Sequence, residues 1–198
     1  MEYFQRPDNI KKNELMGPHE LLLRKNRSLF LYGIIAPVML RSDAYSSMYT
    51  QDMILALDAQ EHAPIKLYID SPGGYVSSGF TLFDTMREVS KIGSEIHTYG
   101  RSCQSMAVLI LAAGTKGHRY VYKNTRIMLH LPSGNAEGDS DDIALQSKEI
   151  NKNKSLLIDN LIECGATKSS KQILKDINKE YWMGAEEAID YGIADKIV

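Results

Sequence analysis

The sequence predicts an α/β fold of repeated βαβ units around a mainly parallel sheet, with one long helix projecting from it. Two observations predict the sheet: a short apolar run, turn residues and a helix-type pattern follow one another over residues 65–89 and again over 95–113. Such units in series imply right-handed crossovers between parallel strands. The third observation is the stretch 141–164, whose apolar residues recur on one helical face.

Composition limits the classes of function. The 198 residues, 43% hydrophobic and 24% charged, fit one globular domain with a small appendage at most. A formal net charge of -2 gives no electrostatic basis for binding nucleic acid or an anionic membrane. The longest apolar run, 106–113, is far shorter than the ~20 residues that span a bilayer, and residues 1–12 lack a secretory-signal pattern.

The two cysteines lie far apart and lack the spacing of metal ligands. We therefore expect free thiols in a reducing compartment, a cytoplasmic location and no metal site.

The N-terminal half contains elements of both types. Residues 1–17 are polar and predict a loose arm, after which the pattern indicates a helix at 18–27, a strand at 28–34, a helix at 46–60, a strand at 65–70 and a helix at 77–89. The turn Ser71-Pro72-Gly73-Gly74 joins the last two of these elements.

A second unit of the same kind follows. It consists of a strand at 95–99, a turn at 100–104 and a small, apolar helix at 105–113 that Gly114 closes as a C-cap. Two further strands are expected at 119–122 and 126–131.

The last third begins with a Gly-rich, acidic stretch at 134–140, where Ser140 or Asp139 is suited to cap the long helix. Its apolar face contains four residues, Ile143, Ile150, Leu157 and Leu161. Gly165 ends this helix, and we expect shorter helices at 169–177 and 185–191 and a final strand at 193–198. The long apolar face must be covered either by the body of the chain or by another subunit.

Three features together meet the needs of acyl transfer. Ser105 begins the buried helix, His130 ends an apolar strand, and Gly73-Gly74 presents backbone amides at the start of another helix. Taken singly, each has an ordinary structural explanation: an N-cap serine, a hydrogen-bonded histidine and a strand-to-helix turn. Together they supply a nucleophile, a base and oxyanion donors. The other histidines, His19, His62, His97 and His118, have no comparable setting, and we interpret them as surface or incidental residues.

From residue 65 onward the chain resembles the ClpP peptidase family, which has the ClpP/crotonase fold. The matching stretches are YIDSPGG at 68–74, FDTM at 83–86, SMA at 105–107, LAAGTKGHRY at 111–120, NTRIMLHLP at 124–132 and the tail 183–196. They cover roughly three quarters of the chain.

This resemblance implies a role for each part of the site. Ser105 would be the nucleophile, His130 the general base, and the amides of Gly74 and Met106 the oxyanion hole. A peptide would bind as an added strand beside Gly74 and the substrate-binding residues Tyr75, Pro132 and Ser133.

The third member of the triad departs from the family pattern. Where the family has a catalytic Asp before an aromatic residue, this chain has Glu180, and Asp176 is a second candidate. A glutamate can orient a histidine, but its carboxylate is one methylene further from the backbone.

The resemblance also implies an organisation: an N-terminal arm and short helix at 1–27, a head domain at 28–132 and 166–198, and a handle at 133–165. The handle would interleave two heptameric rings into a barrel. A AAA+ Clp unfoldase would deliver unfolded polypeptides, and no cofactor is expected. The alternatives are a catalytically weak or silent subunit of a mixed ring, a crotonase-like acyl-CoA enzyme, and a membrane-bound signal-peptide peptidase relative.

Overall fold

The computed structural model describes residues 18–37, 47–134 and 136–198, and the expected arm at 1–17 lies outside this range. The helices are α1 (Pro18–Asn26), α2 (Ser47–Gln60), α3 (Val76–Ile92), α4 (Met106–Ala112), α5 (Ser140–Glu163), α6 (Ser170–Asp176) and α7 (Ala185–Asp190). The strands are β1 (Ser28–Tyr32), β2 (Ile65–Ser71), β3 (Ile96–Gln104), β4 (Arg119–Leu129), β5 (Tyr181–Met183) and β6 (Lys196–Ile197).

The strands form one sheet in the order β1-β2-β3-β4-β5, with β6 also paired to β4. All neighbours are parallel except β4 and β5, so the predicted α/β class and mainly parallel sheet are confirmed. The sequence analysis did not predict β5, because three residues are too few to show a strand pattern.

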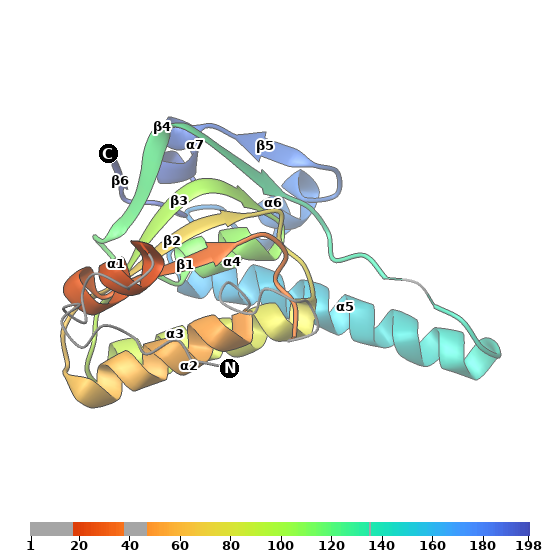
Figure 1. Cartoon of the computed structure of the whole chain (residues 1–198). Helices are drawn as coiled ribbons and strands as arrows, with labels where there is room; N and C mark the ends of the chain where they lie inside the picture. Colours follow the sequence, from red (N-terminus) through yellow and green to blue (C-terminus); the bar gives the residue numbers. More distant parts are fainter. Residues whose placement is uncertain (1–17, 38–46, 135) are drawn as a thin grey trace, which may run out of the picture.

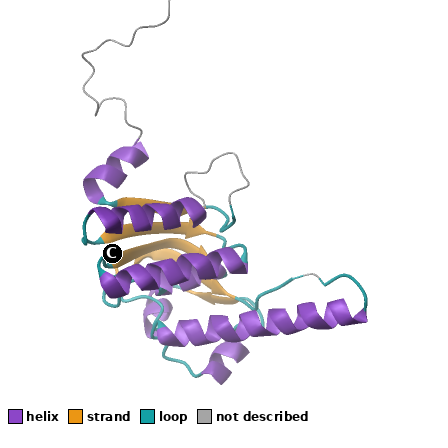
Figure 2. Cartoon of the chain, turned by 90° about the horizontal axis from the view of Figure 1, so that it is seen from below, coloured by secondary structure: helices purple, strands orange, loops and turns teal. Residues whose placement is uncertain are grey.

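Helices α2, α3, α4 and α5 all lie on one side of the sheet (Figures 1 and 2). Strand residues that point to this side, such as Leu31, Leu67 and Ile96, are fully buried. Helix α4 is buried over its whole length because it lies between the sheet and the outer helices. The period of two along each strand therefore separates the face that packs against these helices from the opposite face.

The face opposite helices α2 to α5 has a row of aromatic rings that runs across the strands. The ring of Phe30 stacks on that of Tyr68 at 5.4 Å, Tyr68 on Tyr99 at 4.7 Å, and Tyr99 on Tyr120 at 4.8 Å between centroids. These four side chains are half-buried, and helices α2 to α5 cover the opposite side of the sheet.

Some predicted boundaries differ from the structure, and the final strand, expected at 193–198, is only Lys196–Ile197. The expected turn at 100–104 belongs to β3, which pairs with β4 after a register shift between Gly100 and Ser102. The two expected strands at 119–122 and 126–131 form the single strand β4. An irregularity inside paired strands looks like a turn when only local residue types are read.

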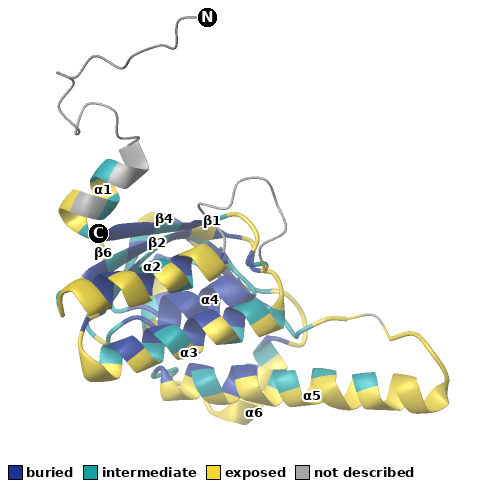
Figure 3. Ribbon diagram, turned by 60° about the horizontal axis from the view of Figure 1, so that its bottom comes forward, coloured by how far each residue is buried: buried dark blue, intermediate teal, exposed yellow. Residues whose placement is uncertain are grey.

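Helix α5 extends well beyond the body of the molecule (Figure 1). Asp139 caps it, accepting hydrogen bonds from the N–H groups of Asp141 and Asp142, as one of the two predicted caps. Its buried residues, Leu157, Ile158 and Leu161, all lie near its C-terminal end, and the rest is exposed or half-buried (Figure 3). The body of this chain therefore covers only part of the predicted apolar face. Among the described residues, no helix is long and apolar enough to cross a membrane.

Candidate active site

Ser105 lies at the sharp turn from β3 into α4. Its φ is 53° and its ψ is -125°, a conformation that L-residues rarely adopt. Its side chain makes no cap hydrogen bond to the helix, so it is not an ordinary N-cap serine. A rare backbone conformation held by the surrounding structure often marks a functional position.

His130 directly follows β4, the strand beside β3. Its Nε2 lies 2.9 Å from the Ser105 Oγ, within hydrogen-bond distance. The N–H of Ser105 donates to the carbonyl of Met128 at 2.8 Å, which fixes the turn against β4. The two predicted side chains thus meet because their strands are parallel neighbours with their C-terminal ends at one edge of the sheet.

The Gly73-Gly74 turn lies against the same position. A Cβ added at Gly73 would lie 2.7 Å from the Cβ of Ser105 and 3.0 Å from the amide nitrogen of Met106. The backbone of Gly73, with φ of 88°, therefore approaches the serine turn more closely than any residue with a side chain is able to.

The amides of this turn differ in their partners. The N–H of Gly73 donates to the hydroxyl of Ser71 at 3.1 Å. Within the described part of the chain, the N–H groups of Gly74 and Met106 donate no backbone hydrogen bond outside the regular elements. The two amides that the resemblance implies for an oxyanion hole thus have no partner among these bonds, and their role stays a prediction.

The two candidate carboxylates have other partners. Glu180 accepts a hydrogen bond from the indole of Trp182 at 3.1 Å. Asp176 accepts hydrogen bonds from Gln172 and from the Tyr191 hydroxyl. Among the described residues, no carboxylate is hydrogen-bonded to His130.

The backbone nevertheless brings Glu180 near His130. In the antiparallel pair of β4 and β5, the last pair is Leu129 opposite Tyr181, so His130 and Glu180 each lie one residue beyond it. In this structure the Glu180 carboxylate bonds Trp182, and its role beside His130 stays a prediction.

The residues expected to bind peptide directly follow Gly74 and lie just after His130 in the sequence. Tyr75 is 62% exposed, and its N–H donates to the carbonyl of Ile35. Pro132 is half-buried and Ser133 is exposed, just after His130.

Neither cysteine is a competing nucleophile. Both thiols are free and buried. Burial raises the pKa of Cys103 well above its usual range and that of Cys164 to about 11. A thiol needs a lowered pKa to react as thiolate near neutral pH.

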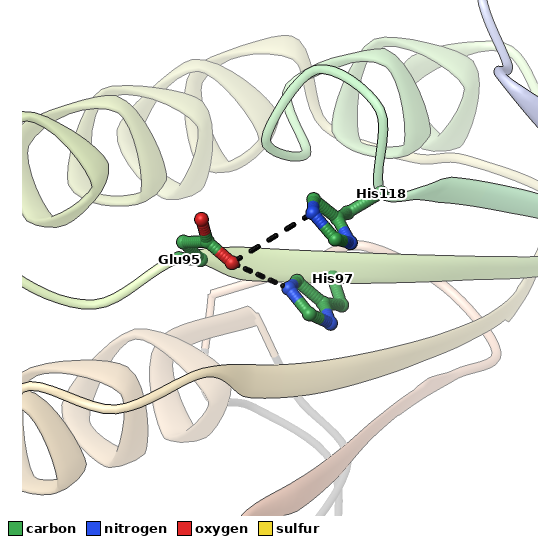
Figure 4. A group of neighbouring side chains, drawn as sticks. All are labelled: Glu95, His97 and His118. Carbon is green, nitrogen blue, oxygen red and sulfur yellow. Dashed lines mark hydrogen bonds and ion pairs between the residues drawn. The ribbon is translucent and has the colours of Figure 1, made fainter.

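The sequence analysis missed one cluster of polar side chains. It interpreted His97 and His118 as incidental, but the structure brings them together with Glu95 (Figure 4). The i,i+2 spacing of Glu95 and His97 at the start of a predicted strand indicates that their side chains lie on the same face. The approach of His118 could not be predicted in this way, because it depends on the pairing of two strands.

The geometry as a whole defines a candidate hydroxyl-nucleophile site of the serine hydrolase class. A serine in a rare conformation, bonded to an imidazole and flanked by free amides, has the parts that acyl transfer requires.

Comparison with known proteins gives the family. The family model for Clp protease matches residues 21–198. The ATP-dependent Clp protease proteolytic subunit 2 of Chlamydia trachomatis serovar D is 43% identical over 136 residues, which are 68% of this chain and 64% of that protein. Subunit 1 of Chlamydia felis is 40% identical over 148 residues, 74% of this chain and 70% of that protein.

Subunit 2 of Chlamydia abortus is 44% identical over 136 residues, again 68% of this chain and 64% of the relative. The chain thus spans somewhat less than two thirds of the length of the subunit 2 proteins it matches. With a family match over most of its length, this chain belongs to the Clp protease family.

Proposed function

We propose that this chain is a serine endopeptidase subunit that hydrolyses peptide bonds of unfolded polypeptides. The observation that carries the proposal is the 2.9 Å contact between Ser105 Oγ and His130 Nε2 beside the Gly73-Gly74 turn. Family membership supports the same reaction.

In this proposal Ser105 attacks the carbonyl carbon of the scissile peptide bond while His130 takes the hydroxyl proton. The imidazolium then gives that proton to the leaving amine, which departs and leaves an acyl-enzyme. A water molecule, deprotonated by the same imidazole, attacks the ester and releases the second product.

The amides of Gly74 and Met106 would hold the oxyanion that forms in each step. Backbone N–H groups suit this task because they are fixed before the charge develops. The peptide would lie as an extended strand beside Gly74, with Tyr75, Pro132 and Ser133 contacting its side chains.

We propose that the active form is a homo-oligomer of two stacked heptameric rings, with residues 133–165 as the handle between them. The exposed apolar residues of α5, among them Leu145 at 65% exposure, support a covering partner. The names of the relatives, which describe ATP-dependent proteolytic subunits, support delivery of substrates by a AAA+ Clp unfoldase. A cytoplasmic location is supported by the two free thiols.

The direct test is labelling with a fluorophosphonate probe, followed by peptide mapping of the modified residue. We expect labelling of Ser105 in the oligomer, and none in Ser105→Ala or after His130→Ala. A purified oligomer that neither reacts with the probe nor cleaves an unfolded protein contradicts the proposal. Ser78→Ala, which alters a half-buried serine on α3, is the matched control and should react as the unchanged protein does.

A second candidate function is a catalytically weak or silent subunit of a mixed ring. The hydrogen bond between Glu180 and Trp182 favours it, because that bond holds the carboxylate away from His130. Trp182→Phe keeps an aromatic ring at this position and removes the indole N–H. If the bond restrains Glu180, peptidase activity should rise in Trp182→Phe and in Glu180→Asp. Full peptidase activity of the unchanged protein, with no gain in either variant, would reject the hypothesis of a silent subunit.

The crotonase-like alternative is disfavoured by the serine–histidine contact, since acyl-CoA chemistry on that fold relies on carboxylates or bound water. Turnover of an acyl-CoA thioester that persists in Ser105→Ala would revive it.

A further inference from the structure

Three side chains with metal-binding atoms meet at the edge of the sheet where β3 and β4 begin. Glu95 immediately precedes β3, His97 is its second residue, and His118 immediately precedes β4 (Figure 4). One carboxylate oxygen and one ring nitrogen from each histidine all lie within 4.8 Å of one another. The Oε2 of Glu95 is 2.9 Å from Nε2 of His97 and 3.9 Å from Nε2 of His118.

The sheet fixes the backbone of this cluster. The N–H of Ile65 donates to the carbonyl of Glu95 at 2.8 Å, and the N–H of Thr98 donates to the carbonyl of His118 at 3.1 Å. The three side chains therefore start from backbone that lies in a paired strand or directly before one and is hydrogen-bonded to the sheet. Fixed ligand backbones lower the cost of ordering a site around an ion.

His118 has the outer partner that metal-binding histidines usually have. Its Nδ1 lies 3.1 Å from the hydroxyl of Tyr120. With Nδ1 as the donor in this hydrogen bond, Nε2 presents its lone pair toward Glu95 and His97. Such a bond fixes both the tautomer and the orientation of a ligating imidazole.

We infer that Glu95, His97 and His118 form a site for a divalent first-row transition metal ion, with zinc as the probe. Two imidazole nitrogens and one carboxylate oxygen are a ligand set that zinc accepts, leaving a fourth position for water. In a tetrahedral site with metal–ligand bonds of about 2.0 Å, the ligand atoms lie about 3.3 Å from one another. This separation falls between the 2.9 Å from Glu95 Oε2 to His97 Nε2 and the 3.9 Å from Glu95 Oε2 to His118 Nε2.

Small side-chain rotations complete the coordination. The two imidazole rings stack at 4.0 Å with 4° between their planes, so they must tilt for both lone pairs to converge. The side chains of His118 and Glu95 are 35% and 50% exposed, which leaves room for rotation and gives an ion access from solvent.

The site is separate from the proposed catalytic pair. His97 and His118 lie where β3 and β4 begin, whereas Ser105 and His130 follow the ends of the same parallel strands. Failure of the metal site would leave the peptidase proposal unaffected, and the reverse also holds.

The test is calorimetric titration of the assembled, full-length protein with zinc chloride. We expect one site per chain, weakened at least about tenfold in His118→Ala and in Glu95→Gln. His62→Ala is the matched control, because His62 also pairs with one carboxylate, that of Asp58 at 3.0 Å, but belongs to no three-ligand group among the described residues. It should bind zinc as the unchanged protein does.

Tyr120→Phe tests the outer partner. It keeps the ring that stacks on Tyr99 and removes only the hydroxyl, and we expect zinc affinity to fall about tenfold. Equal weakening in His62→Ala and His118→Ala, or no change in either His118→Ala or Glu95→Gln, overturns the inference.

Anomalous diffraction from zinc-soaked crystals of the unchanged protein decides the question without any variant. A peak among Glu95, His97 and His118 supports the site. A peak only at other positions, such as His130, overturns it.

Discussion

At the scale of single residues, the candidate site depends on one backbone conformation. Ser105, with φ of 53°, turns its hydroxyl away from the helix and toward His130 instead of capping the first turn. Gly73 makes this possible because its missing side chain leaves space for the serine turn. The nucleophile and the glycine turn are therefore one structural unit.

Gly73→Ala should reduce kcat/KM about 100-fold, because the new methyl group would displace the Ser105 turn by a fraction of an ångström or more. The matched control is Gly117→Ala, which has nearly the same φ, 90° against 88°, but no atom within 4 Å of the added Cβ. Both changes carry a similar backbone strain of about 1 kcal/mol, measurable by urea unfolding. Equal activity in the two variants would contradict this account.

At the scale of elements, a buried ion pair ties β4 to the C-terminal segment. The guanidinium of Arg119 binds Asp195 through both Nε and Nη2, at 2.9 and 2.6 Å. Its Nη1 donates to the carbonyls of Cys164 and Gly192, so the end of α5 and the turn after α7 share this one cation. Burial opposes ionisation of Asp195, but the hydrogen bonds and charge of Arg119 outweigh it and lower the pKa of this carboxyl.

Asp195→Asn should destabilise the fold by about 3–5 kcal/mol at pH 7, because it leaves the buried Arg119 without its counter-ion. A carboxyl whose folded-state pKa is lowered adds stability above its unfolded value, about 3.9, and loses it as the pH falls through the folded value. The unchanged protein should therefore lose stability below about pH 4, and the variant should lose less over that range.

Urea unfolding at pH 7 and at acid pH measures both effects. Asp159→Asn on the exposed side of α5 is the control, and its stability should stay within about 0.5 kcal/mol of the unchanged protein. A variant of Asp195 as stable as this control would show that the ion pair is not what holds these elements together.

At the scale of the whole molecule, the described part of the chain covers α5 only near its C-terminal end, and the preceding turns are mostly exposed (Figure 3). These turns expose apolar side chains, including Ile143 at 44%. Exposed apolar residues along a projecting helix are typical of a surface that another subunit covers.

Leu145→Asp should reduce the assembly to smaller species, because it places a charge in the proposed contact between rings. Light scattering coupled to size-exclusion chromatography measures the mass. Ser147→Asp adds the same charge at an exposed polar position of the same helix and should leave the mass unchanged. An unaltered mass in Leu145→Asp, with circular dichroism like that of the unchanged protein, would remove α5 from the interface.

Much of this fold could be predicted from residue patterns. Local sequence predicts the strand–turn–helix units around Ile65 and Ile96, the long helix and its Asp139 cap. This is possible because the repeat of apolar residues, every two in a strand and every 3.6 in a helix, involves only residues close in the sequence. The boundaries inside β3 and β4 were not predictable, because a register shift depends on the partner strand.

The sequence by itself determined most of the elements, their order and the residue types from which a serine–histidine site is made. Only the tertiary structure decided that Ser105 turns away from its helix, that Glu180 bonds Trp182, and that His97 stacks on His118. The physical reason is the distance along the chain over which each feature is determined. The periodicity of apolar residues depends on residues close in the sequence, whereas these contacts depend on the register between strands and on side-chain rotamers that packing against distant residues selects.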